Sequence, residues 1–501
     1  MERGSGLLVH ISSLPSKHGI GTFGKEARKF VRFLNAANQK YWQILPLNPT
    51  SFGDSPYQSF SAFALNPYFI DLDILVKKGY LTKEEVKNIK GGTNYSYVDY
   101  GKVYLERFDI LYLAYTRARE LIKEKLEKFL KRHKKWLDDY ALFMTIKDLF
   151  DGKSWQEWPD KYRKHNKKTL LEVKQLHFEK YYFYVFLQYE AYLQYSKLKK
   201  YASRKGIKII GDMPIYVALD SADVWANHKL FLLNSNRRPT KVAGVPPDFF
   251  SSTGQLWGNP IYDYEYCKKT SYRWWKMRFK LMSKLYDLLR IDHFRGFDSY
   301  WVIPSKEKTA INGEWKQGPG YDLFKACEKE ISKIQIIAED LGIITDSVKE
   351  LKEKCGFPGL KVYQFAFDDY EYTSEETKYE ELINPFLPHN YEENSVAYIG
   401  THDNDIQDNF IKEHPSLHEA MLDYLKIDNV KDINDTLIGS LMRSNADVVI
   451  FMPQDILRLG KYSRINTPGV ATGNWQFRFR KYHFSKELAS HLKQMVLESN
   501  R

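Results

Sequence analysis

Short runs of apolar, β-branched and aromatic residues recur along the chain, and most are followed by a turn and then by a helix-like segment. Eight of these runs have the length and composition of buried strands. They are residues 7–11, 41–47, 207–210, 288–292, 334–339, 360–365, 396–401 and 448–452. Segments between them, such as 25–37 and 274–289, carry apolar residues at three- and four-residue spacing, which predicts amphipathic helices. Strands that alternate with helices favour a parallel sheet.

The number of strands sets the expected architecture. Eight strands with intervening helices predict an α/β fold, a closed (β/α)8 TIM barrel, whose usual size is roughly 250 residues and more than about 400 with insertions. We expect residues 1–501 to form a single catalytic barrel domain with its extra length in two insertions. Residues 48–205, after the second strand, predict a mainly helical insertion subdomain. Residues 213–272, after the third strand, are mostly turn-like and aromatic and predict a lid that binds substrate.

Composition fits a folded protein, since 43% hydrophobic and 15% aromatic residues can build a large core. The net charge of +12 would permit a nucleic-acid partner, but Lys alternates with Glu in segments such as 120–135, as on a solvated helix face. We therefore expect no nucleic-acid partner. No apolar run is long enough for a membrane span or a signal peptide, which predicts a cytoplasmic protein with no membrane partner. The sequence does not predict the oligomeric state.

Acidic residues stand at the C-terminal ends of four predicted strands. Asp212, Asp292 and Glu339 end three of them, and Thr401-His402-Asp403-Asn404 ends another. In a (β/α)8 barrel, catalytic groups come from the ends of different strands and converge at one mouth. We expect these four segments to form the functional site.

Converging carboxylates are typical of metal binding or of acid–base work on a glycosidic bond. Arg290 and Asp292 are two residues apart, so a strand places both side chains on one face. The guanidinium is expected to lower the pKa of Asp292 and keep it ionised, although such a pair can also be purely structural. Glu339 follows an apolar run, so burial is expected to raise its pKa. One ionised and one protonated carboxyl group are what retaining glycoside cleavage requires.

The remaining polar groups complete this hypothesis. Asp403 would be a third carboxylate that stabilises positive charge in the transition state, and His402 and His293 would donate hydrogen bonds to sugar hydroxyls. A two-metal hydrolase would carry a His-x-His pair after the first strand, where His10 stands alone. The three cysteines, at 267, 327 and 355, lack metal-ligand spacing. We therefore expect no metal site.

Three segments resemble the signature sequences of the 4-α-glucanotransferases, called amylomaltases or disproportionating enzymes, of glycoside hydrolase family 77 in the α-amylase clan. They are Arg-Ile-Asp-His-Phe-Arg-Gly (290–296), Ala-Glu-Asp-Leu-Gly (338–342) and Gly-Thr-His-Asp-Asn (400–404). Further matching segments are 53–59, 211–217, 245–251, 253–260, 466–469 and 473–475. The match runs in family order from Ser12 to near the C-terminus, which makes it far more specific than any single motif.

The resemblance implies transfer of an α-1,4-glucan segment, through a covalent glycosyl-enzyme, to the 4-hydroxyl of another glucan or of glucose. Donors would be α-1,4-glucans and maltooligosaccharides, and no metal or organic cofactor is implied. Asp292 would be the nucleophile, Glu339 the acid and base, and Asp403 the transition-state stabiliser. The resemblance also implies that no C-terminal β-domain follows the barrel. The alternatives are an α-amylase-clan hydrolase and a non-catalytic glucan-binding or nucleic-acid-binding protein.

The resemblance and the polar pattern together assign a set of substrate-binding residues. These are Arg290, His402, Asp212, Tyr57, Ser55, Gln58, Phe249, Phe250, Trp257, Asn259, His293 and Asn466. Phe249, Phe250 and Trp257 would cover a sugar in the lid, and Tyr57 would lie at an acceptor subsite. Phe52 and Tyr100 stand where some relatives carry two tyrosines of a second glucan site. A phenyl ring cannot donate a hydrogen bond, so the sequence leaves that second site open.

Overall fold

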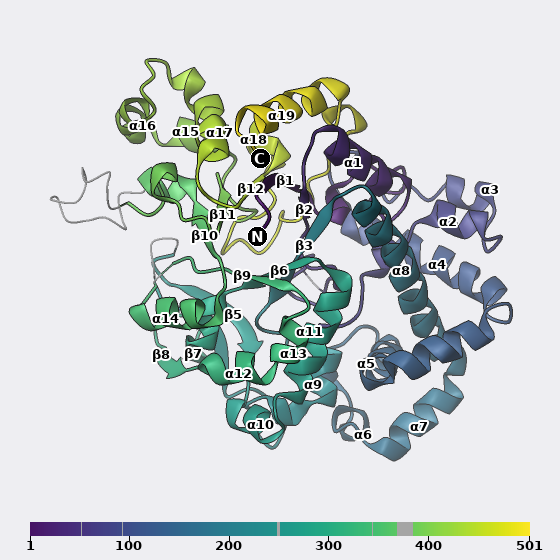
Figure 1. Ribbon diagram of the computed structural model, residues 1–501. Coiled ribbons are helices and arrows are strands. Elements are labelled where there is room, and N and C mark those ends of the chain that lie inside the picture. Colours follow the sequence, from purple (N-terminus) through teal and green to yellow (C-terminus); the bar gives the residue numbers. More distant parts are fainter. Residues whose placement is uncertain (52, 93, 248–250, 343, 368–383) are drawn as a thin grey trace.

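Eight parallel strands form a ring at the centre of the computed structural model, which describes residues 1–501 except 52, 93, 248–250, 343 and 368–383 (Figure 1). The strands are β1 (Gly4–Leu8), β2 (Tyr41–Gln43), β3 (Lys208–Pro214), β6 (Leu288–Asp292), β9 (Gln335–Ala338), β10 (Gly359–Val362), β11 (Ser395–Tyr398) and β12 (Val448–Phe451). Their order is β10-β11-β12-β1-β2-β3-β6-β9. The ring closes where the Ala338 N–H donates to Pro358 O at 2.9 Å. The predicted (β/α)8 barrel is confirmed.

The two faces of the strands are packed differently. Apolar side chains that point into the barrel include Leu8, Tyr41, Ile210, Leu288 and Ile337, and all are at most 1% exposed. The side chains next to them in sequence pack outward, against the helices. Both faces are therefore buried, which explains why these strands are continuous apolar runs without a polar face.

Each predicted strand run overlaps an observed strand, but several strands are shorter than predicted. The run 360–365 is a strand only to Val362, because Tyr363–Phe367 forms a 3-10 helix. The run 41–47 is a strand only to Gln43, which pairs with Leu8, the last residue of β1. The apolar run extends beyond the residues of β2 that pair with β1 and β3, so the pattern does not reveal where the strand ends.

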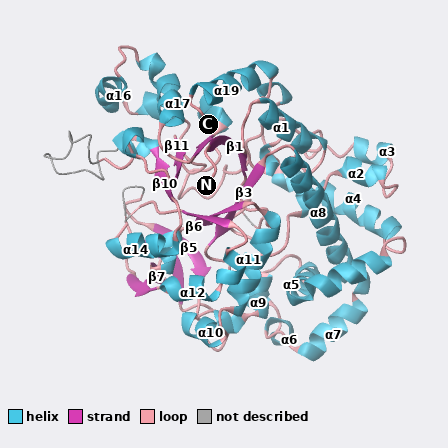
Figure 2. Cartoon of the chain, in the orientation of Figure 1, coloured by secondary structure: helices cyan, strands magenta, loops and turns pink. Residues whose placement is uncertain are grey.

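Helices surround the ring of strands (Figure 2). Those between or after the barrel strands are α1 (Lys25–Ala36), α11 (Arg273–Leu285), α12 (Gly320–Ala326), α13 (Glu328–Ile331), α14 (Asp346–Cys355), α15 (Gln407–Glu413), α16 (His418–Leu425), α17 (Ile433–Arg443), α18 (Pro453–Ile456) and α19 (Lys486–Glu498). The C-terminal helix α19 lies beside α1 (Figure 1). The chain thus ends on the outer helix layer of the barrel.

Most of the chain between β2 and β3 is helical. It contains α2 (Leu72–Lys77), α3 (Lys83–Lys87), α4 (Tyr100–Ala118), α5 (Lys123–Leu149), α6 (Asp160–Arg163), α7 (Lys167–Leu176) and α8 (Phe178–Arg204). These helices make a lobe at one side of the barrel (Figure 1). Aromatic contacts join α5 to α8, for example between the rings of Trp136 and Tyr192 at 5.9 Å.

The helices in the described part of the chain include none with the length and hydropathy of a membrane span.

Residues 213–272 contain more regular secondary structure than the sequence indicated. They contain α9 (Ala222–Ala226), α10 (Tyr264–Lys269) and two strands, β4 (Lys241–Val245) and β5 (Gln255–Pro260). β4 also pairs with β7 (Ser299–Pro304), which pairs with β8 (Glu314–Gln317), in an antiparallel sheet of order β5-β4-β7-β8. The sequence did not predict β4 and β5, which pair with each other within the segment, while β4 also pairs with β7 from the loop after β6.

Gly211, on β3 next to Asp212, gives a test of barrel packing. A Cβ at this position would lie 2.2 Å from ring carbons of the buried Tyr286. We expect Gly211→Ala to lower the melting temperature, since overpacking of a core costs about 1–3 kcal/mol. Gly101→Ala is the matched control, because its nearest contact would be 3.6 Å in helix α4. An unchanged melting temperature for Gly211→Ala would show that the Tyr286 ring can move aside without loss of stability.

Candidate active site

The guanidinium of Arg290 lies among three carboxyl groups at the C-terminal mouth of the barrel. Its Nη1 donates to both carboxylate oxygens of Asp212, at 3.0 and 2.8 Å, and to Asp292 Oδ1 at 3.0 Å. Its Nη2 lies 4.0 Å from Glu339 Oε2. The predicted convergence of acidic residues from different strand ends is therefore present in the structure.

Strand register explains this geometry. In the β3–β6 pair, Asp212 stands opposite Arg290. Arg290 and Asp292 lie on the face of β6 that also carries the inward-pointing Leu288, because side chains alternate along a strand. Glu339 follows Ala338, the last residue of the neighbouring strand β9. The same period of two that fills the barrel with apolar residues thus places the charged ones at its mouth.

Tyr57 links Asp212 to the loop after β11. Its hydroxyl donates to Asp212 Oδ2 at 2.9 Å, so it accepts from His402 Nε2, also at 2.9 Å. This bonding pattern assigns the imidazole proton to Nε2, which also lies 3.2 Å from Asp403 Oδ2. Burial lowers the pKa of His402 and favours the neutral ring. The rings of Tyr57 and His402 stack with centroids 5.4 Å apart.

Asp403 is held from the loop after β12. Asn466 Nδ2 donates to Asp403 Oδ1 at 2.6 Å, and the Asn466 N–H donates to His402 O at 3.2 Å. Arg464, which sequence reasoning missed, donates to Asn466 O and to Asp403 O at 2.9 and 3.0 Å. Asn404 closes the turn by accepting from the Thr401 N–H at 2.9 Å. Asp403 keeps 39% of its side chain exposed, so it is fixed and still accessible.

His293 connects Glu339 to the lid segment. The His293 N–H donates to Glu339 Oε2 at 2.5 Å, and its backbone is left-handed, with φ 55°. Its ring meets the Trp257 indole edge-on, with centroids 4.8 Å apart. Burial lowers the pKa of His293 to about 3, so its ring is neutral. His293 thus contacts the acid through its backbone and the lid through its side chain.

The remaining predicted binding residues lie in the loop after β2 and on strand β5. Ser55 Oγ accepts from the Tyr57 N–H at 3.2 Å, and Gln58 Nε2 donates to Asn259 Oδ1 at 3.3 Å. Asn259 in turn donates to Val217 O at 2.8 Å. These bonds join the turn that carries Tyr57 to the lid segment.

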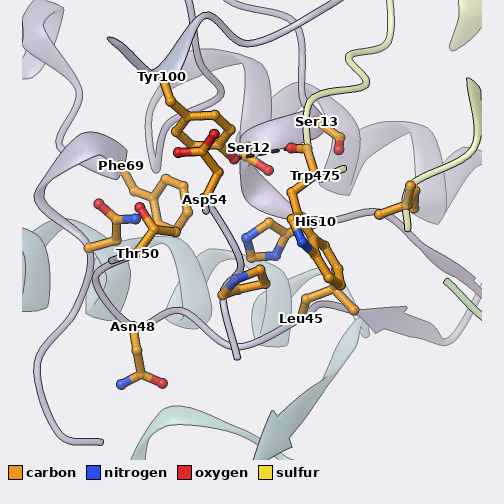
Figure 3. A pocket seen from close by; sticks show the side chains of 13 residues that line it. His10, Ser12, Ser13, Leu45, Asn48, Thr50, Asp54, Phe69, Tyr100 and Trp475 are labelled. Atoms are coloured by element: carbon orange, nitrogen blue, oxygen red, sulfur yellow. Dashed lines mark hydrogen bonds between the residues drawn. The ribbon is translucent and has the colours of Figure 1, made fainter. Parts of the chain in front are cut away.

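Three of the predicted aromatic residues are not described by the structure. Phe249 and Phe250 of the expected lid, and Phe52 of the expected second glucan site, lie outside the described residues. Tyr100 is 9% exposed, and its hydroxyl donates to Trp475 O at 3.1 Å. It lines a small pocket together with His10, Asp54 and Trp475 (Figure 3).

Burial governs the charge state of the carboxyl groups. It raises the pKa of Glu339 to about 8 and that of Asp212 to about 7, as expected for Glu339. Burial also raises the pKa of Asp292, against the lowering effect of Arg290. The expectation of a depressed pKa for Asp292 was wrong, because burial of the carboxyl group outweighs the lowering effect of Arg290. Since Arg290 is closer to Asp292 than to Glu339, Asp292 is the better place for negative charge.

Arg290 is the cationic group at the centre of this acid cluster. Among the residues described, no three His, Cys, Asp or Glu side chains are grouped in a way that would hold a metal ion. The arrangement offers one carboxyl group that accepts a hydrogen bond from Arg290, one whose pKa is raised to about 8, and a third held by a hydrogen bond at the rim. Acid–base and nucleophilic work on a glycosidic bond needs such a set.

Comparison with known proteins agrees with this chemistry. The family model described as 4-alpha-glucanotransferase matches residues 9–484. The chain belongs to this family. The 4-alpha-glucanotransferase of Clostridium butyricum is 47% identical over 485 residues, covering 96% of this chain and 97% of that protein. The Thermus thermophilus 4-alpha-glucanotransferase is 41% identical over 513 residues, covering 100% of this chain and 99% of that protein.

A solved structure shows the same fold. The amylomaltase from Streptococcus agalactiae in complex with acarbose has a TM-score of 0.93 and 40% sequence identity, with both chains fully covered. The predicted family and the glycosyltransferase activity are therefore confirmed. The family assignment favours a 4-alpha-glucanotransferase over the alternative α-1,4-glucan hydrolase.

The hydrogen bond from Asn466 to Asp403 can be tested in the enzyme. Asn466→Asp replaces the donor with a second carboxylate, so we expect kcat at pH 7 to fall about tenfold or more, equivalent to about 1.4 kcal/mol. The deficit should shrink as the pH is lowered, because one carboxyl group then takes up a proton and donates. In Asn466→Ala, which adds no charge, the loss should not depend on pH. Equal pH profiles for both variants would contradict this explanation.

Proposed function

We propose that Asp292, Glu339 and Asp403 carry out the transfer reaction of this 4-alpha-glucanotransferase by a retaining double displacement. The observation that supports this assignment is the Arg290 guanidinium, which contacts Asp292 at 3.0 Å and lies 4.0 Å from Glu339. It brings two carboxyl groups with different charge preferences to one place. The proposed donors are α-1,4-glucans and maltooligosaccharides, and the proposed acceptors are glucose or another glucan.

In the first step, Asp292 is the nucleophile. An oxygen of its carboxylate attacks the anomeric carbon, and the bond from that carbon to the glycosidic oxygen breaks. Glu339 gives its proton to the departing oxygen, which leaves as a free 4-hydroxyl. The raised pKa of Glu339, about 8, keeps this proton available at neutral pH.

In the second step, Glu339 is the base. Its carboxylate removes the proton from the 4-hydroxyl of the acceptor, whose oxygen attacks the anomeric carbon and displaces Asp292. The new α-1,4 bond replaces the one that was broken, and both carboxyl groups return to their starting charge. Water gives hydrolysis at this stage, so transfer requires that water is excluded and that the acceptor is held in position.

Asp403 and His402 are proposed to stabilise the oxocarbenium-like transition state and to bind sugar hydroxyls. Asn466 and Tyr57 hold them in place, and Asp403 keeps one side open to the site. Asp212 would anchor Arg290, to which both of its carboxylate oxygens are bound. These roles use the contacts that already exist in the structure.

The segments outside the ring of strands are proposed to bind and cover the substrate. Residues 213–272 would form the lid. Of its proposed binding residues, Trp257 and Asn259 are described by the structure, whereas Phe249 and Phe250 lie outside the described residues. Tyr57, Ser55 and Gln58 would meet the acceptor from the loop after β2. Residues 48–205 would form the mainly helical insertion subdomain. The acarbose bound to the Streptococcus agalactiae amylomaltase supports a saccharide ligand for this site.

The role of Asp292 can be tested with maltotriose. We expect Asp292→Asn to abolish turnover while the binding of maltooligosaccharides is retained, because the amide keeps the shape and loses the nucleophile. The wild-type enzyme should give glucose and longer maltodextrins with no net rise in reducing ends. Chromatography of the products and isothermal titration provide the two measurements. Retained turnover in Asp292→Asn would falsify the assignment, and a steady rise in reducing ends would favour the hydrolase.

The acid role of Glu339 predicts a pH profile. Since the proton must be present for the first step, kcat/KM for maltotriose should be level near neutrality and fall above a pKa of about 8. A maltosyl fluoride donor needs no proton for its leaving group, so the rate of glycosyl-enzyme formation from this donor should show no basic limb. Glu339→Ala should then form glycosyl-enzyme from the fluoride but turn over no maltotriose. A basic limb that persists with the fluoride would assign it to another group.

A further inference from the structure

The indole of Trp475 contacts the two rings that hold the acid cluster in place. Its ring centroid lies 5.6 Å from that of Tyr57 and 5.9 Å from that of His402, while those two rings are stacked at 5.4 Å. The three rings thus touch one another in a closed group. Trp475 ends the Gly-Asn-Trp segment 473–475, to which the sequence assigned no role.

The backbone of Trp475 is in an unfavourable conformation. Its φ is 66°, in the left-handed region that bulky side chains rarely adopt. Two buried hydrogen bonds maintain it, since the Trp475 N–H donates to Ile465 O at 2.7 Å and Tyr100 Oη donates to Trp475 O at 3.1 Å. Strain that the surrounding structure maintains in this way is typical of functional sites.

The indole also borders the small pocket that His10, Asp54 and Tyr100 line (Figure 3). Trp475, which is 8% exposed, contacts both rings and lines this pocket, whereas Tyr57 and His402 are not among the side chains that line it. Without the indole, both rings gain room to tilt toward the pocket. A tilt would lengthen the bonds from Tyr57 to Asp212 and from His402 to Tyr57, which are both 2.9 Å.

We propose that Trp475 is a positioning residue for glucan transfer, which fixes the stacked pair Tyr57 and His402 so that the hydrogen bond from Tyr57 to Asp212 and the 3.2 Å contact of His402 Nε2 with Asp403 Oδ2 are kept. It acts through these two residues and not on the sugar itself. The proposal rests on the proposed roles of Asp212 and Asp403 in the same site. It assigns Tyr100 the supporting task of holding the Trp475 backbone.

The test compares Trp475→Leu with Trp475→Phe on maltotriose. The leucine removes the ring contacts and should lower kcat about tenfold or more with less than a threefold change in KM. Phenylalanine restores an aromatic ring and should return kcat to within about threefold of the wild type. The acidic limb of kcat should move to higher pH in Trp475→Leu, because His402 loses burial and Asp212 loses the Tyr57 hydrogen bond, and both changes favour protonation.

A pair of tyrosine variants separates positioning from general stability. Tyr100→Phe removes the hydrogen bond to Trp475 O and should lower kcat and shift the acidic limb in the same direction, to a smaller extent. Tyr195→Phe, on helix α8, removes a similar buried bond, from Tyr195 Oη to Leu285 O at 2.8 Å, and should leave both unchanged. These variants keep their aromatic ring, so they test the proposal even when Trp475→Leu does not fold.

The outcomes that overturn the proposal are distinct from failure of the proposed mechanism. A loss of kcat in Trp475→Leu that equals its loss of folded protein, with an unmoved acidic limb, would make Trp475 merely structural. Equal effects of Tyr100→Phe and Tyr195→Phe would also overturn it. Turnover retained by Asp292→Asn would instead refute the catalytic assignment, whereas the shift of the acidic limb in Trp475→Leu would still support positioning.

Discussion

The contact between Arg290 and Asp212 is the interaction on which the site depends. Both side chains are almost fully buried, at 3% and 2% exposure, and a buried charge without a partner is strongly unfavourable. Their strands pair so that the two residues stand opposite each other, and Arg290 uses the same nitrogen for Asp292. The ion pair therefore joins β3 to β6 and also determines where the charge of the reactive acids is stabilised.

Along several barrel strands, the apolar residues of the core come first and the charged residues of the candidate site follow at the C-terminal end. On β6 the inward positions are Leu288, Arg290 and Asp292, so one strand passes from apolar to charged within five residues. The adjacent strands do the same, from Ile210 to Asp212 on β3 and from Ile337 to Glu339 after β9. The apolar layer holds the strands in register, and that register sets the relative positions of the acids above it.

The barrel strands and the acids at their ends could be predicted because both follow from local sequence patterns. Apolar runs and strand-end acids lie within a few residues of each other, and the roles proposed for Asp292, Glu339 and Asp403 start from residue type. The strands β4 and β5 were missed; they pair with each other, and the second partner of β4, strand β7, comes from the loop beyond barrel strand β6. The raised pKa of Asp292 was missed because it depends on burial in the folded structure, which outweighs the effect of the neighbouring Arg290. The segment 473–475 matched the family, but the position of Trp475 was missed, since its contacts come from distant loops.

One physical condition accounts for two requirements of the proposed reaction. Tyr57, His402 and Trp475 contact one another beside Asp212 and Asp403, and the Trp257 ring contacts that of His293, whose N–H donates to Glu339. Burial raises the pKa of Glu339 to about 8, so the proposed acid would keep its proton for the leaving oxygen. The same burial would disfavour water near the proposed glycosyl-enzyme, where it would compete with the acceptor. In the proposed mechanism a more open site would lose the acid and admit water together, so acid catalysis and the preference for transfer would depend on the same packing.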